Sequence, residues 1–203
     1  TFKSNGLSDH EVLEVYQAKS INGNLTAQPA ETETIFTIPL VPEMADEPTQ
    51  TNGGTIGFVV NGAVFFNPFE GGADTDIYAV EDNFEIDGIP FVDACGGHPE
   101  PQFISYHYHG VPVCTTDVLD TEGEHSVLIG YLLDGFPVYG PQDVDGEHPE
   151  DLDECNGHFG ETPEFPDGTY HYHMTTERPY SVNCYMGVVD ESLLMPGGGA
   201  GGP

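Results

Sequence analysis

Basic side chains are almost absent from this chain: its 203 residues include three Lys or Arg against 35 Asp or Glu, a formal net charge of −32. So large an excess of negative charge repels nucleic acid and anionic lipid, which excludes both as partners. Cations are the partners that such a chain attracts. Most of the carboxylates are expected to lie in solvent and keep the protein soluble.

Long apolar runs and Trp are also absent, so the sequence predicts no membrane span, and 12 Phe and 10 Tyr must supply much of the core. No amphipathic pattern predicts a long helix, although Asp74–Phe84 is expected to hold a short one. The 26 Gly and 17 Pro indicate many turns. We therefore expect a mostly-β fold, a single β-sandwich or distorted-barrel-like domain with long loops and little helix.

Cysteines in the tight Cys-x-x-Cys spacing are missing, which argues against a cysteine-rich zinc site. The chain has four Cys in all, an even number that predicts disulfides and an oxidising compartment. It begins at Thr1 with neither an initiator Met nor a signal peptide, so we expect a secreted protein, mature after signal removal. Asn24 begins a glycosylation sequon, which is a weak signal on its own.

What the chain does contain is a doubled frame around the tetrapeptide Tyr-His-Tyr-His. In each copy a Cys-x-Gly-His segment precedes the tetrapeptide and a second Cys follows it. The first copy comprises Cys95, His98, Tyr106–His109 and Cys114, and the second comprises Cys155, His158, Tyr170–His173 and Cys184. The repeat favours pairing of Cys95 with Cys114 and of Cys155 with Cys184, while pairing across the two copies stays open.

Histidines at positions i and i+2 of an extended segment lie on one face, with the tyrosines on the other. Imidazole is the commonest ligand of Zn, Cu and Ni, so two such faces brought together would supply a four-nitrogen site that the remaining motif histidines replace or orient. The predicted metal ligands are His98, His107, His109, His158, His171 and His173. The alternative is that neutral histidines and tyrosines lock the strands through hydrogen bonds without a metal. His10, His125 and His148 lie outside the frame and are expected at the surface.

An acidic loop is predicted over residues 141–167, and part of it alternates carboxylates around a glycine as calcium loops do. The candidate calcium ligands are Asp143, Asp145, Glu147, Asp151 and Asp153. The spacing does not complete an EF-hand, so a solvated loop is the alternative. No nucleophile elbow and no phosphate-binding glycine loop is present, so the sequence points to no catalytic residue and to no organic cofactor.

Strands are predicted where apolar residues alternate or flank turn residues. Asn61-Gly62 and Asp134-Gly135 each separate two apolar runs and predict hairpins with type I′ turns. Asp87-Gly88 is expected to form a third turn. The remaining predicted strands are Glu11–Tyr16, Thr32–Leu40 and Val182–Val189.

The ordered landmarks of the chain closely resemble those of the YHYH-domain family of secreted proteins. They are Ile38–Leu40, Val60–Gly62, Cys95–Pro99, Tyr106–His109, Ser126–Gly130, Asp134–Gly140, Asp151–His158, Gly168–His173 and Pro179–Tyr180. The match covers residues 35–189, between an N-terminal extension, 1–34, and a Gly-rich tail, 190–203. The resemblance implies an exported, β-rich domain and suggests metal binding, but it implies no particular activity.

Three functions follow from these patterns. The favoured one is an extracellular structural protein that self-assembles head-to-tail into filaments, with residues 1–34 or the tail adding a strand to a neighbour and cations stabilising the domain. The first alternative is an extracellular or periplasmic protein that binds copper or zinc. The second is a metal-dependent enzyme, which requires an open coordination position beside a cleft.

Overall fold

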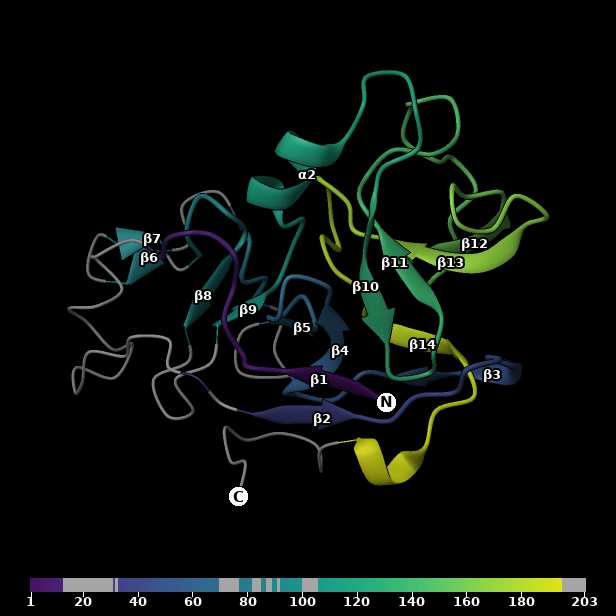
Figure 1. Cartoon of the computed structure of the whole chain (residues 1–203), viewed down its shortest axis with the longest axis horizontal. Coiled ribbons are helices and arrows are strands. Elements are labelled where there is room, and N and C mark those ends of the chain that lie inside the picture. The colour runs from purple at the N-terminus through teal and green to yellow at the C-terminus, as the bar shows by residue number, and fades with distance from the viewer. Residues whose placement is uncertain are drawn as a thin grey trace.

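The fold is mostly β, as predicted (Figure 1). The computed structural model describes residues 1–12, 31, 33–69, 77–81, 85–86, 89–90, 92–99 and 106–194. Its strands are β1 (Phe2–Ser4), β2 (Thr34–Phe36), β3 (Met44–Gln50), β4 (Thr55–Val59), β5 (Val64–Phe66), β6 (Glu85–Ile86), β7 (Ile89–Pro90), β8 (Gly97–Pro99), β9 (Tyr106–Tyr108), β10 (Leu128–Leu132), β11 (Pro137–Tyr139), β12 (Gly157–Gly160), β13 (Thr169–His173) and β14 (Cys184–Gly187). The helices are α2 (Val113–Leu119) and the 3₁₀ helix η1 (Glu191–Leu193).

One eight-stranded sheet organises the chain, in the order β12-β13-β11-β10-β4-β5-β9-β8. The described strands form an open row and do not close into a barrel. β4 and β10 pair antiparallel at the centre, and on each side a hairpin is followed by a parallel pair, β5 with β9 and β11 with β13. An antiparallel partner, β8 or β12, forms each edge. The two halves of the sheet therefore repeat the same arrangement, and each half contains one Tyr-His-Tyr-His strand.

Both predicted hairpins form, but their turns differ from the prediction. Gly62 and Gly135 have φ of +109° and +92°, whereas neither Asn61 nor Asp134 is among the described residues with positive φ. A type I′ turn needs positive φ at both central residues, so that prediction is wrong. Each loop instead has three residues and closes with the amide of its glycine donating to the carbonyl three residues earlier, at 3.0 Å in both hairpins. The side chain before each glycine accepts a backbone N–H two residues on, which fixes the turn.

Several element predictions need correction. Ile77–Glu81, the described part of the helix expected at Asp74–Phe84, forms a bridge and a turn, and helix α2 follows the first Tyr-His-Tyr-His segment instead. The acidic stretch 141–167 is not all loop, because it contains strand β12, which belongs to the second copy of the repeated frame. The last predicted strand is shorter than expected and pairs with β3, which the sequence did not indicate.

Some predictions fall on residues outside the described ranges. Glu11 and Val12 are not in a strand, and residues 13–16 lie outside the description, as do Asn24 and the turn residues Asp87 and Gly88. β1 pairs with β2 inside the same chain. Residues 13–30 and 195–203, which carry most of the filament prediction, are also outside the described ranges. Among the described residues, no helix has the length and apolarity that a bilayer crossing requires.

The core forms where the tyrosines of the repeated frame point. Tyr106, Tyr108 and Tyr172 have no exposed surface, and Tyr170 is 5% exposed. Their rings pack with apolar side chains from β4, β5, β10 and β11. The alternation of β-strand side chains then places the motif histidines on the opposite face of each strand.

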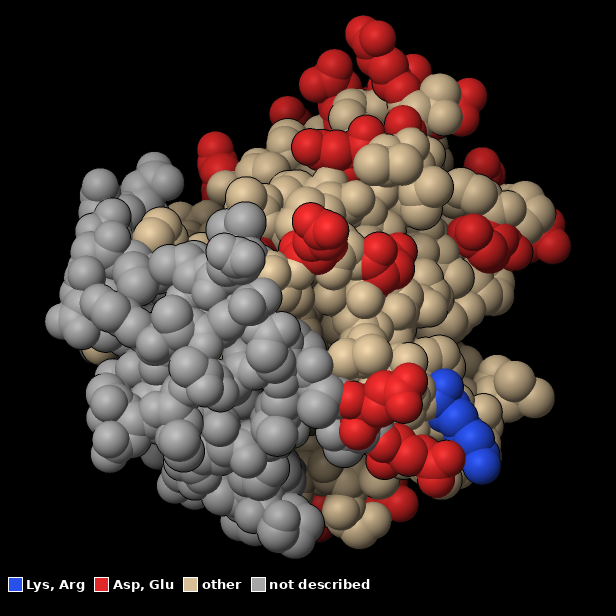
Figure 2. All heavy atoms as spheres, turned by 60° about the vertical axis from the view of Figure 1, so that its left-hand side comes forward, with Lys and Arg blue, Asp and Glu red and all other residues tan. Residues whose placement is uncertain are grey.

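Acidic side chains form separate groups over the visible described surface, most of which belongs to other residues, and few Lys or Arg lie among them (Figure 2). They crowd the upper end of the molecule, where Figure 1 shows the loops after α2 and after β11. These two loops touch, because a Cβ on Gly146 would meet the backbone of Gly123. Exposed acids on or beside the two loops are Asp117, Glu122, Glu124, Asp145, Glu147 and Glu150.

Candidate metal centres

The second Tyr-His-Tyr-His strand brings three imidazoles together. His158 on β12 lies opposite His171 on β13, and His173 lies two residues further along the same face. Their Nε2 atoms form a triangle with sides of 3.1 Å between His158 and His171, 3.1 Å between His171 and His173, and 3.3 Å between His173 and His158. We call this set the C-terminal triad. All three rings are buried.

The hydrogen bond of Nδ1, the other ring nitrogen, determines whether each Nε2 carries a hydrogen. Nδ1 of His158 lies 2.7 Å from a carboxylate oxygen of Asp151. Nδ1 of His171 lies 3.1 Å from the carbonyl oxygen of Thr169, and Nδ1 of His173 lies 2.7 Å from that of Gly140. These oxygens only accept hydrogen bonds, so each Nδ1 carries the hydrogen. A neutral imidazole has one N–H, and each Nε2 therefore presents a lone pair to the other two.

Burial favours the neutral form of two of these rings, His171 and His173. It lowers the pKa of His171 to about 4 and that of His173 to about 3, because an imidazolium loses its hydration in the protein interior. At neutral pH the 3.1 Å contact between Nε2 of His171 and Nε2 of His173 therefore joins two lone pairs and is not a hydrogen bond. A metal ion about 2.0–2.1 Å from each nitrogen would see them at angles of roughly 100°, close to tetrahedral. The triangle thus fits a metal ion, and without one the Nε2 lone pairs of His171 and His173 repel each other.

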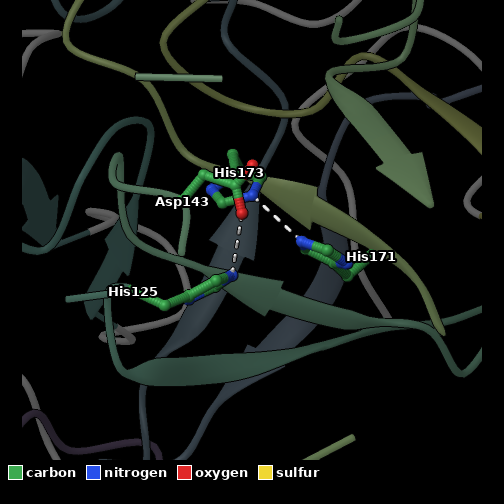
Figure 3. Close-up of side chains that lie close together, drawn as sticks. All are labelled: His125, Asp143, His171 and His173. Atoms are coloured by element: carbon green, nitrogen blue, oxygen red, sulfur yellow. Dashed lines mark hydrogen bonds and ion pairs between the residues drawn. The ribbon is translucent and has the colours of Figure 1, made fainter. Parts of the chain in front are cut away.

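Two further side chains lie against the C-terminal triad (Figure 3). Ligand atoms of Asp143, His125, His171 and His173 all lie within 4.8 Å of one another. One oxygen of Asp143 is 3.8 Å from Nε2 of His125, and the other is 3.9 Å from Nε2 of His158. His125 donates from Nδ1 to the carbonyl of Ser126 at 2.7 Å, so its Nε2 also presents a lone pair to this group.

His125 corrects a sequence prediction, since it was expected at the surface and is only 7% exposed. Ser126, two residues before β10, and Gly140, just after β11, bring the loops that hold His125 and Asp143 to the end of β13. His148 is exposed, as predicted. His10 is half-buried, with its Nε2 2.7 Å from the hydroxyl of Tyr108. Only pairing between distant strands could reveal the role of His125, because no local motif surrounds it.

The first Tyr-His-Tyr-His strand builds a matching set, His98, His107 and His109, which we call the N-terminal triad. Their ligand atoms lie within 4.8 Å of one another, and Nε2 of His107 is 3.1 Å from Nε2 of His109. Nδ1 of His109 lies 2.7 Å from the carbonyl oxygen of Asn67. Phe66 stacks on the ring of His107 with centroids 3.8 Å apart. Burial lowers the pKa of His109 to about 4 and holds that of His98 well below its usual value.

The supports of the two triads repeat as well. Asn67 and Gly140, whose carbonyls orient His109 and His173, hold equivalent places after β5 and β11. Asp93 accepts from the amides of Cys95 and Gly97 and from the hydroxyl of Tyr106. Asp153 accepts in the same way from Cys155, Gly157 and Tyr170. Each aspartate thus ties its Cys-x-Gly-His turn to the tyrosine face of its own Tyr-His-Tyr-His strand.

The disulfides bracket their own motifs, which confirms the pairing that the repeat favoured. Cys95 bonds to Cys114 and Cys155 bonds to Cys184, and no cysteine is free. The expected four-nitrogen site is wrong in its assembly. The two His-x-His pairs lie near opposite ends of the sheet, and each is completed by the histidine of its own Cys-x-Gly-His turn (Figure 1).

The five candidate calcium ligands do not gather in one place. Asp143 faces the C-terminal triad, Asp151 accepts from His158, and Asp153 caps the turn at Cys155. Asp145 accepts from the amide of Glu147. Among the described residues, the candidate metal groups include Asp143 and none of the other four. Calcium binding stays a prediction.

Comparison with known proteins agrees with this repeated architecture. A family model described as "YHYH protein" matches residues 35–149 and 142–187, which include both triads and both disulfides. No curated protein and no solved structure matches the chain. The family model covers most of the sequence, so the chain belongs to the YHYH protein family.

Proposed function

We propose that this protein binds transition-metal ions outside the cytoplasm, with one copper or zinc ion at each histidine triad. The observation that carries the proposal is the triangle of Nε2 lone pairs in the C-terminal triad. Three imidazoles whose Nδ1 atoms already donate hydrogen bonds can all direct their Nε2 lone pairs to one point only if a cation lies there. Imidazole is a ligand that suits both copper and zinc.

The surroundings of the triads support the same function. Outer partners on Nδ1 orient metal-binding histidines and raise their basicity, and the carboxylate of Asp151 and the carbonyls at Thr169 and Gly140 would do so here. Two disulfides hold the frames, and they persist in oxidising compartments such as the periplasm or the extracellular space. The charge of −32 favours the approach of cations.

This proposal takes the first alternative from the sequence ahead of the filament subunit. Head-to-tail assembly depends on terminal segments that lie mostly outside the described residues, so it stays a prediction. The truncation of residues 1–34 or 190–203 remains its test. A metal-dependent enzyme likewise stays a prediction.

Metal content of single-histidine variants tests the proposal. We expect the wild type, saturated with Zn²⁺ and freed of excess ion, to hold two ions per chain, and His171→Ala or His107→Ala to hold one. His148→Ala, at an exposed histidine outside both triads, serves as the control and should keep two. Circular dichroism of each variant separates a lost ligand from a lost fold. A wild type that retains no ion, or two folded variants that keep both ions, would overturn the proposal.

A further inference from the structure

The C-terminal triad has a charged neighbour that bears on which ion it selects. Asp143 lies 3.9 Å from Nε2 of His158, and its side chain is 22% exposed against 5% for that of His158, so it is the more solvent-accessible of the two. We infer that Asp143 is the fourth ligand of this centre and makes it selective for a divalent ion over a monovalent one. This inference rests on the proposed function, since it concerns the ion that the same triad would hold.

The first step is electrostatic. Three neutral imidazoles contribute no negative charge, so a divalent ion in this buried triad would leave two uncompensated positive charges. Burying such charge is costly, and a carboxylate in contact with the ion offsets part of that cost. The attraction between a carboxylate and a divalent ion is twice that for a monovalent ion at the same distance. Carboxylate oxygen also suits harder ions than Cu⁺.

His125 is the second, independent observation. Its Nε2 is buried and has no hydrogen-bond partner among the described residues, although it lies 3.8 Å from Asp143 and within 4.8 Å of a ligand nitrogen of both His171 and His173. A buried lone pair aimed into a group of ligands needs a positive partner. His125 thus adds a second electron-pair donor beside Asp143, and a cation bound between them would satisfy both.

The surface around Asp143 agrees with a route for divalent cations. The buried His125 and the partly buried Asp143 lie on the two loops that touch at Gly123 and Gly146. The exposed parts of these loops carry Glu122, Glu124, Asp145 and Glu147. A rim of like charge raises the local concentration of counter-ions, and more so for ions of higher charge.

Affinities of Asp143→Asn for Zn²⁺ and Cu⁺ test the inference. Competition with chromophoric chelators gives both, with Cu⁺ kept reduced by ascorbate in the absence of oxygen, and His171→Ala identifies the binding step that belongs to this centre. At that step we expect the ratio of Zn²⁺ affinity to Cu⁺ affinity to fall by about tenfold in Asp143→Asn. The amide keeps an oxygen that can accept from the Val144 amide, as Asp143 does at 2.7 Å, so the loop should hold.

The matched control is Asp145→Asn, an exposed carboxylate on the same loop and outside the ligand group, which should leave the ratio unchanged. A change of less than about threefold in Asp143→Asn, or an equal change in Asp145→Asn, overturns the inference alone if the wild type binds both ions. A wild type that binds neither ion at this triad instead overturns the proposed function.

Discussion

Each histidine of the C-terminal triad is held in one tautomer by the atom that its Nδ1 faces. Two of these atoms are backbone carbonyls, which offer no hydrogen to Nδ1. The hydrogen-bonding alternative considered for the sequence stays open, because the Nδ1 atoms of His171 and His173 and the hydroxyl of Tyr170 do make hydrogen bonds. Those bonds leave the close Nε2 atoms of the triad without a hydrogen-bonding account, and a metal ion would supply one.

At the hairpin loops a single residue distinguishes the two halves of the sheet. Asn61 donates from Nδ2 to the hydroxyl of Tyr108 at 2.9 Å, whereas Asp134 accepts from the hydroxyl of Tyr172 at 2.5 Å. Asp134 has no exposed surface and also accepts from the amide of Gly187. Burial raises the pKa of Asp134 from 3.8 to about 6, against hydrogen bonds that lower it.

This shift predicts a pH dependence of stability. The folded state holds the proton of Asp134 more tightly than the unfolded state, so the free energy of unfolding falls as pH rises from 3.8 through about 6. The contribution is about 3 kcal/mol, fully present below the lower value. Urea titrations of the metal-free proteins measure this contribution as the free energy of unfolding of the wild type minus that of Asp134→Asn. We expect this difference to be larger at pH 4 than at pH 7 by about the same amount. A difference independent of pH would contradict the argument.

At the scale of elements, the centre of the sheet depends on two glycines. Gly57 on β4 and Gly130 on β10 lie in the antiparallel pair that joins the two halves. A Cβ on Gly57 would lie 2.5 Å from the carbonyl oxygen of Tyr131, and one on Gly130 would clash with the carbonyl of Phe58. At both points the added Cβ would meet backbone atoms of the neighbouring strand, which cannot move aside as a side chain can.

Gly130→Ala should therefore lower the free energy of unfolding by about 3 kcal/mol, through overpacking in the middle of the sheet. Gly123→Ala is the comparison, because that residue has φ of +80° and nothing within 4 Å of an added Cβ. It should lose only about 1 kcal/mol, the conformational cost of a left-handed alanine. Chemical denaturation measures both. Equal losses in the two variants would show that the central strands can separate to admit a methyl group.

The sequence predicts elements best where a local period or turn pair carries the signal. The alternation of Tyr106–His109 and of Tyr170–His173 predicted buried tyrosines opposite the histidines, and the hairpins followed from their glycines. The turn type could not be predicted because it depends on hydrogen bonds that the side chains of Asn61 and Asp134 accept from the backbone amides two residues further on. His125 and the association of each His-x-His pair with its own Cys-x-Gly-His turn depend on strand pairing between distant segments, which no local pattern contains.

At the scale of the whole molecule, the sheet is a repeat with a centre at β4 and β10 and a histidine triad near each end. Each half supplies its own aspartate-capped turn, disulfide and carbonyl acceptor, so the two centres can form independently. Acidic residues occur throughout both halves of the sequence, and only Lys3, Lys19 and Arg178 are basic. Cation binding at two separate places is what this architecture would provide.

Anomalous diffraction from crystals saturated with Zn²⁺ tests that claim most directly. The account predicts two strong peaks per chain, one among the ring nitrogens of each triad, with the C-terminal peak about 2.0–2.1 Å from Nε2 of His158, His171 and His173. A map that shows the histidines in the same arrangement with no peak at either triad would contradict it.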